Sequence, residues 1–272
     1  MTSFMRICRP LLSALAVALL LVAGGVEATG APPRKAGQYN PEDQTVEMFA
    51  AIQSGEIAVR LIPKNSTLSH VLIENKTDQP LNVKLPDAFA GVPALAQVGG
   101  PTGTSSSSTS HSNSGQAAGG GMGGMGMGGM GMGMGGMMNV APEKVGRFDV
   151  ATVCLEHGKA EPRAAMHYEI KPLEAVTTKP GVRELCQMLG NRQINQRAAQ
   201  AAAWYLNNGM SWQVLAAKQI HYPDGVNQPY FSPQEIQWGM QIASVALRTA
   251  KEQQINQPQQ GETSTPSSNS RY

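Results

Sequence analysis

The fold is decided by one stretch of the sequence, Phe148-Asp-Val-Ala-Thr-Val-Cys-Leu155. Phe148, Val150, Thr152 and Cys154 share one face of a strand and the residues between them the other, because successive side chains of a strand point to opposite sides. A second alternating run, residues 166–171, follows the turn residues Gly158 and Pro162. The sequence therefore predicts two neighbouring strands here.

Three more alternating runs precede this region, at residues 57–61, 71–73 and 81–85. The segment Asn75-Lys-Thr-Asp-Gln-Pro80 has turn chemistry and is expected to join the last two as a hairpin. Two separate half-sheets would be too small to bury themselves, so all five strands should form one sheet. The fold class expected is α+β, with a small antiparallel β-sandwich of about five strands.

A segment with very little to bury separates the two groups of strands. Residues 99–138 contain no Asp, Glu, Lys, Arg, aromatic residue, Val, Leu or Ile, and residues 119–138 are only Gly and Met. Glycine has the highest backbone entropy cost of folding, so we expect 99–138 to be a disordered insertion. It would interrupt a single sandwich formed by residues 39–98, with an N-terminal helix, and by residues 139–178.

The two ends of the chain have other roles. Residues 1–28 resemble a signal peptide: Arg6 and Arg9 precede an apolar run, and cleavage is expected after Ala28. Residues 29–38 and 254–272 are expected to be disordered. Residues 179–253 follow a helical period and predict a helical bundle, whose best start signal is the capping box Ser232-Pro-Gln-Glu235.

Charge and motifs exclude several classes of function. The chain has 21 Lys+Arg and 19 Asp+Glu, a balance that does not predict nucleic-acid binding. After signal removal no membrane span is expected. No motif for a hydrolase, zinc protease, dinucleotide site or P-loop is present, so no catalytic residue and no cofactor is predicted.

The methionines suggest one metal hypothesis. Eight of them lie in the second half of the insertion: Met122, Met125, Met127, Met130, Met132, Met134, Met137 and Met138. Thioethers are soft ligands that select Cu(I), so an exported copper buffer is one interpretation. The alternative is a low-complexity linker or an adaptable surface without metal.

Two cysteines remain once the signal segment is removed, Cys154 and Cys186. An exported protein can form a disulfide, and a Cys154–Cys186 bridge would tie the sheet to the helices. Two buried free thiols are the alternative, because cysteine packs well as a small apolar residue. The cluster Cys154-Leu-Glu-His157 also resembles a metal or thiol site, but strand geometry would turn His157 away from Cys154 and Glu156.

Three blocks resemble a family of uncharacterised secreted proteins typical of planctomycete bacteria. They are Leu81-Asn-Val-Lys-Leu-Pro-Asp-Ala-Phe-Ala-Gly-Val-Pro93, Thr152-Val-Cys-Leu-Glu-His-Gly158 and Gln196-Arg-Ala-Ala-Gln-Ala-Ala-Ala-Trp204. The resemblance spans most of the chain that is expected to fold. It implies export and a shared fold, and it transfers no activity.

Part of the third block has a second resemblance. Ala199-Gln-Ala-Ala-Ala-Trp204 is similar to the T-Q-x-x-Φ-W motif of bacterial thioester-domain surface adhesins, with Ala199 in place of the threonine. This resemblance implies an internal thioester between Cys154 and a glutamine, for which Gln237 is the nearest match. The alternative is a core helix that buries Trp204.

Together these observations predict an exported, non-enzymatic protein with a structural or protein-interaction role in the cell envelope or outside the cell. Its partner would be an unknown protein or a component of the envelope. A Cu(I)-buffering protein and a thioester adhesin are the two alternatives.

Overall fold

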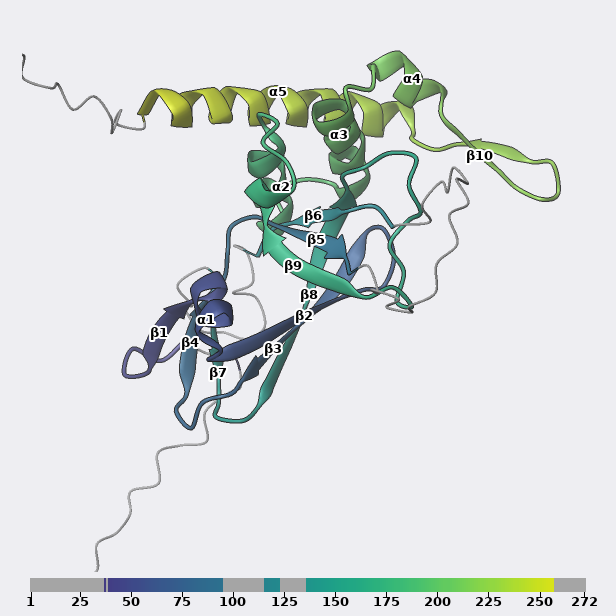
Figure 1. Cartoon of the computed structure of the whole chain (residues 1–272). Coiled ribbons are helices and arrows are strands. Elements are labelled where there is room, and N and C mark those ends of the chain that lie inside the picture. Colours follow the sequence, from purple (N-terminus) through teal and green to yellow (C-terminus); the bar gives the residue numbers. More distant parts are fainter. Residues whose placement is uncertain (1–36, 38, 95–114, 123–135, 257–272) are drawn as a thin grey trace, which may run out of the picture. The chain divides into compact units, whose positions relative to one another are not determined.

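The main sheet of the protein is a closed, antiparallel barrel of six strands (Figure 1). The computed structural model describes Gly37 and residues 39–94, 115–122 and 136–256, all within one unit of the chain, Lys35–Tyr272. In order around the barrel the strands are β2 (Ile57–Pro63), β3 (Leu68–Asn75), β8 (Val145–Cys154), β6 (Ala118–Gly120), β5 (Phe89–Pro93) and β9 (Tyr168–Pro172).

The predicted α+β class is confirmed, but the predicted sandwich is wrong, because the sheet closes on itself. The alternating residues do face the interior as expected: Ile57, Leu61, Val71 and Ile73 are all buried in one cluster. Alternation reveals which face of a strand is buried, not which strands are neighbours. Closure depends on three pairings that the pattern does not encode: β6 with β5, β6 with β8, and β9 with β2.

Strand β8 separates the two largest apolar clusters. Val150 faces the barrel interior, while Val153 and Leu155 face the C-terminal helices, as their alternation predicts. Its residues 145–151 pair with β3, and residues 152–154 pair with β6. Strand β8 therefore connects the β2–β3 hairpin, the Gly-rich segment that contains β6, and the C-terminal helices.

Part of the Gly-rich insertion is ordered, which corrects the prediction for residues 99–138. Residues 115–122 enter the barrel wall, where Ala118–Gly120 forms β6. Gly121 lies against helix α2 (Val182–Gly190): a Cβ on Gly190 would lie 2.6 Å from the Cα of Gly121. Glycine at both positions lets the two backbones touch, and this contact holds the segment in place.

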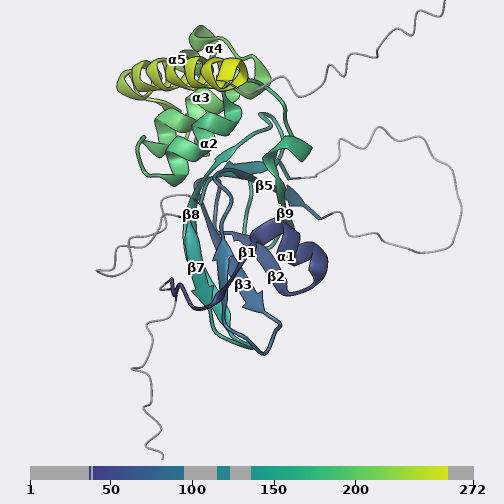
Figure 2. The ribbon, with the colours of Figure 1, turned by 90° about the vertical axis from the view of Figure 1, so that its left-hand side faces the viewer.

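A small sheet lies at the end of the barrel away from the C-terminal helices, where Figure 2 shows β1 and β7. It contains β1 (Gln44–Glu47), β4 (Leu81–Lys84) and β7 (Met137–Val140), in the order β1-β4-β7 (Figure 1). The third predicted strand, residues 81–85, therefore pairs with β1 and β7 and not with β3. Residues 136–138 are ordered as well.

Asn40-Pro-Glu-Asp43 has the residues of a helix start, with Asn as N-cap and Pro at the first helical position, but the early helix begins later. It is α1 (Met48–Ser54), which is capped by Glu47. Buried Asn82 explains the shift, since its Nδ2 donates to the carbonyl oxygens of Asn40 and Asp43 and holds that turn beside β4.

The C-terminal region is helical, as predicted, with one addition. It contains the 3₁₀ turn Leu173–Ala175, then α2, α3 (Gln196–Asn208), α4 (Trp212–Ala217) and α5 (Pro233–Asn256). The short hairpin β10 (Gln219–His221) and β11 (Asn227–Pro229) was not predicted. Ser232 and Glu235 form the predicted capping box, each side chain accepting from the other's backbone N–H.

Several predictions concern residues outside the described ranges. These are the signal peptide 1–28 with its cleavage after Ala28, most of 29–38, residues 99–114 and 123–135 of the insertion, and most of the tail 254–272, although Gln254–Asn256 belong to α5. Among the described residues, no helix combines the length and apolar character that a membrane span needs.

The close approach of Gly121 to α2 can be tested with one methyl group. A Cβ at Gly121 would overlap the carbonyl oxygen of Cys186 and lie 2.5 Å from that of Asp87. These are backbone atoms that cannot move without displacing the elements to which they belong. Gly121→Ala should therefore lower the free energy of unfolding, measured in urea, by about 3 kcal/mol.

Gly225→Ala is the matched control. Its Cβ would meet open space, and the cost comes only from its φ of 81°, roughly 1 kcal/mol. Equal losses in the two variants would contradict the account of Gly121.

Candidate functional site

The weakest pairing in the barrel is between β2 and β9. β2 pairs with β3 over all seven of its residues, from Ile57 to Pro63, but with β9 only at Leu61, opposite Tyr168. From that point the two strands diverge (Figure 1). We call the boundary between β2 and β9 the seam. It is closed by one residue pair, Leu61 with Tyr168, and open beyond it.

A groove of about 510 Å³ lies along this seam. Its walls come from α1, from β2, from the residue after β5, and from β9 with the segment that leads into it. The lining residues are Ile52, Val59, Arg60, Leu61, Ile62, Ala94, Ala164, Met166, His167, Tyr168, Glu169 and Ile170. This volume is in the range of about 300–1,000 Å³ that is usual for ligand sites in proteins.

The groove has an apolar floor and a polar mouth. Val59, Met166 and Ile170 pack half-buried against the barrel core and form the floor with Ile52. Arg60 on β2 and Glu169 on β9, which alternate with Val59 and Ile170, are exposed. The same alternation that fills the barrel thus gives the groove two chemical layers.

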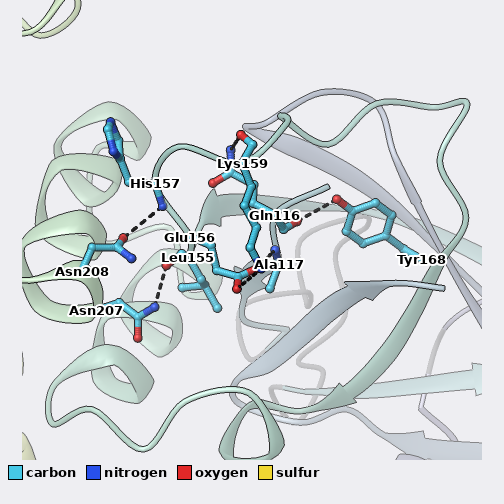
Figure 3. Close-up of polar contacts among 9 residues, drawn as sticks. All are labelled: Gln116, Ala117, Leu155, Glu156, His157, Lys159, Tyr168, Asn207 and Asn208. Carbon is cyan, nitrogen blue, oxygen red and sulfur yellow. Dashed lines mark hydrogen bonds and ion pairs between the residues drawn. The ribbon is translucent and has the colours of Figure 1, made fainter. Parts of the chain in front are cut away.

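Tyr168 fixes the closed end of the groove. Its side chain is buried, and its hydroxyl donates to the carbonyl oxygen of Gln116 at 2.7 Å (Figure 3). Burial is the main cause that raises the pKa of the Tyr168 hydroxyl, and the nearby Cys154 and Glu156 raise it further. The hydroxyl therefore stays protonated and remains a donor. A Cβ on Gly115 would lie 2.8 Å from this hydroxyl, which explains the glycine there.

The cluster Cys154-Leu-Glu-His157 is separated by a turn and not by strand alternation, because β8 ends at Cys154. Glu156 accepts from the backbone N–H of Ala117 at 2.9 Å and pairs with Lys159. His157 points away from them, and its backbone N–H donates to Asn208 of α3 (Figure 3). The turn therefore fastens the barrel to α3 and does not gather these side chains around a metal.

His157 belongs instead to an aromatic and cationic contact on the helices. Its ring meets Trp204 edge-on at 4.8 Å between centroids, and the Lys218 ammonium donates to its Nε2 at 3.1 Å. Lys218 also lies 5.5 Å from the centroid of Trp204. Burial, and then the charge of Lys218, lower the pKa of His157 and favour its neutral form, which can accept this bond.

Cys154 and Cys186, the two cysteines within the described ranges, are buried free thiols in this structure. Cys154 packs with Trp204 and Leu215, whereas Cys186 belongs to the cluster around α2 on the other side of β8. Burial raises the pKa of each thiol to about 12. Smaller contributions come from Glu161 at Cys154 and from Glu184 at Cys186.

The structure does not bring Cys154 to Gln237. Gln237 is exposed on α5, and its side chain accepts from Gln234. The glutamine that does reach Cys154 is buried Gln200, whose side chain accepts from the backbone N–H of Cys154 at 2.8 Å and donates to its carbonyl oxygen at 2.9 Å. The side-chain amide of Gln200 therefore pairs with the backbone of Cys154 as a neighbouring strand would, at the end of β8.

The methionines of the copper hypothesis are divided by the structure. Met122 is fully buried in the barrel core, and Met137 and Met138 lie on β7. The other five are outside the described residues: Met125, Met127, Met130, Met132 and Met134. Within the described ranges, no group of three or more His, Cys, Asp or Glu side chains is placed to hold a metal ion.

The groove could not be found from the sequence. Alternation places Val59 on the inward face, but the groove exists because the ladder between β2 and β9 stops after one pair, and no motif marks that point. Comparisons with protein families, with curated proteins and with solved structures found no match to this chain.

The state of the cysteines predicts a clear result from thiol chemistry. Because thiolate is the reactive form and both thiols have a raised pKa, neither should react with a thiol reagent at pH 8 in the folded chain that lacks residues 1–28. Both should react in denaturant.

Intact mass is the second measurement on the same sample. A mass lower by about 2 Da would reveal the disulfide, in which two thiol hydrogens are lost. A mass lower by about 17 Da would reveal the thioester, formed with loss of ammonia. The calculated mass, unchanged, is the result expected.

Proposed function

We propose that this protein is an exported, non-enzymatic interaction protein that binds an extended segment of a partner polypeptide in the groove between β2 and β9. The open seam carries this proposal. β2 is fully paired on its β3 side, and among the described strands it has a neighbour on the other side only at Leu61. The export part rests on the signal-like residues 1–28.

An extended polypeptide matches both layers of the groove. The edge of a strand presents backbone N–H and C=O groups, and an added peptide strand satisfies such groups with its own. Its side chains alternate, so every second one can reach the apolar floor at Val59 and Ile170 while the others remain at the mouth. Main-chain pairing would give affinity, and the floor would select apolar residues.

The two alternative functions draw less support. Met122, the first methionine of the copper hypothesis, packs in the core and not with other ligands. The glutamine beside Cys154 is Gln200, which is already engaged by the backbone of Cys154. We therefore place the interaction site at the seam.

A steric block of the groove tests this function. Ala164 lines the groove and is exposed, so Ala164→Trp should fill the mouth without disturbing the core. Ala165→Trp is the matched control, since Ala165 is also exposed and does not line the groove. The probe is a displayed library of random peptides of about ten residues, roughly 33 Å when extended.

Peptides selected on the wild-type chain should bind Ala164→Trp at least about tenfold more weakly, a difference of about 1.4 kcal/mol. The same peptides should bind Ala165→Trp as they bind the wild type. Isothermal calorimetry measures both. Equal binding to the two variants, or a library that yields no binder, would overturn the proposed function.

A further inference from the structure

The mouth of the groove carries a cation, Arg60, that no other residue in the described part of the chain neutralises. Arg60 is exposed on β2, and no ion pair or hydrogen bond engages its guanidinium among the described residues. On the opposite side Glu169 already has a partner, since Lys171 lies 3.3 Å away. The carboxylate and the ammonium of that pair offset each other, so that among the described charges at the groove Arg60 has no counter-charge.

The position of Arg60 relative to the seam gives this charge a role. Arg60 immediately precedes Leu61, the one residue of β2 that pairs with β9. On its other edge Arg60 is paired with Leu72 of β3. A segment added to the free edge of β2 would therefore pass Arg60 where the seam begins to open, with the half-buried Val59 beside it.

We infer that the groove selects an acidic extended segment, in which a carboxylate meets Arg60 and alternating apolar side chains face Val59 and Ile170. This inference rests on the proposed function, because it names the chemical class of the partner segment for the same groove. The guanidinium has a planar donor set that matches a carboxylate with two parallel hydrogen bonds, which gives direction as well as attraction.

The chemistry of the occupant follows from what each layer of the groove lacks. Within the described ranges, the groove is lined by an apolar floor, the edge of β2 has no strand neighbour before Leu61, and no acidic side chain pairs with Arg60. An acidic peptide in extended conformation matches all three. A neutral apolar ligand would leave the charge unpaired, and a basic segment would be repelled by it.

Charge reversal is the experiment that tests the partner class. The random peptide library is selected in parallel on the wild-type chain, on Arg60→Glu and on Lys84→Glu. Lys84 is the matched control because it is an exposed residue of β4, outside the groove, and its reversal changes the net charge equally.

The wild type and Lys84→Glu should both select Asp or Glu flanked by alternating apolar residues. Arg60→Glu should select Lys or Arg in that place and bind the acidic peptides about tenfold more weakly. Since a charge at the rim of an interface acts through long-range attraction, wild-type affinity should also fall as salt is raised. In addition, a selected peptide can be methylated at the backbone nitrogens of its odd-numbered or of its even-numbered residues. Only the set whose N–H groups point toward β2 should abolish binding when methylated.

The outcomes separate this inference from the proposed function. If the selected peptides are blocked by Ala164→Trp but show no acidic preference, the inference fails and the proposed function stands. If the chain selects no peptide and instead forms dimers that Ala164→Trp dissociates in sedimentation, the occupant is a second copy and both are overturned.

Discussion

The fold depends on a place where two backbones touch, Gly121 against Gly190 at the end of α2. This contact holds a segment that has almost no side chains and would otherwise have no reason to be ordered. Once it is held, Ala118–Gly120 can bridge β5 and β8 as β6, and the sheet closes into a barrel. Helix α2 thus completes the barrel wall from outside, because the strand itself has little to bury.

The barrel is consequently closed in two unequal ways. At β6 the closure is supported by packing, since Val153 and Leu155 of the β8 region and Cys186 of α2 belong to one buried cluster. At the β2–β9 seam the closure is a single residue pair, fixed by buried Tyr168 and its hydrogen bond to Gln116. This difference places the groove where the barrel has the fewest main-chain bonds, and it leaves an apolar floor beside strand edges that can receive another strand.

Much of this fold could be predicted from side chains that repeat. Alternation at Ile57, Leu61, Val71 and Ile73 gave the correct inward faces, and Ser232 with Glu235 gave the start of α5. The strand at residues 118–120 could not be predicted, because glycine and alanine carry no periodic signal and the order comes from α2. Barrel closure and the groove were missed for a related reason: both are set by which strand edges meet, and a pattern within one strand does not contain its neighbours.

The central claim is that the β2–β9 seam is an open strand edge that a partner segment completes. Native-state hydrogen exchange with residue resolution tests it most directly. Without peptide, the amides of residues 58–60 and 169–171 that face the seam should exchange faster than those between β3 and β8, which share a ladder of seven pairs. Saturation with a peptide selected on the wild-type chain should slow the seam amides and leave the β3–β8 amides unchanged. Seam amides that are already as protected as those of β3 and β8, or that do not respond to the peptide, would contradict the account.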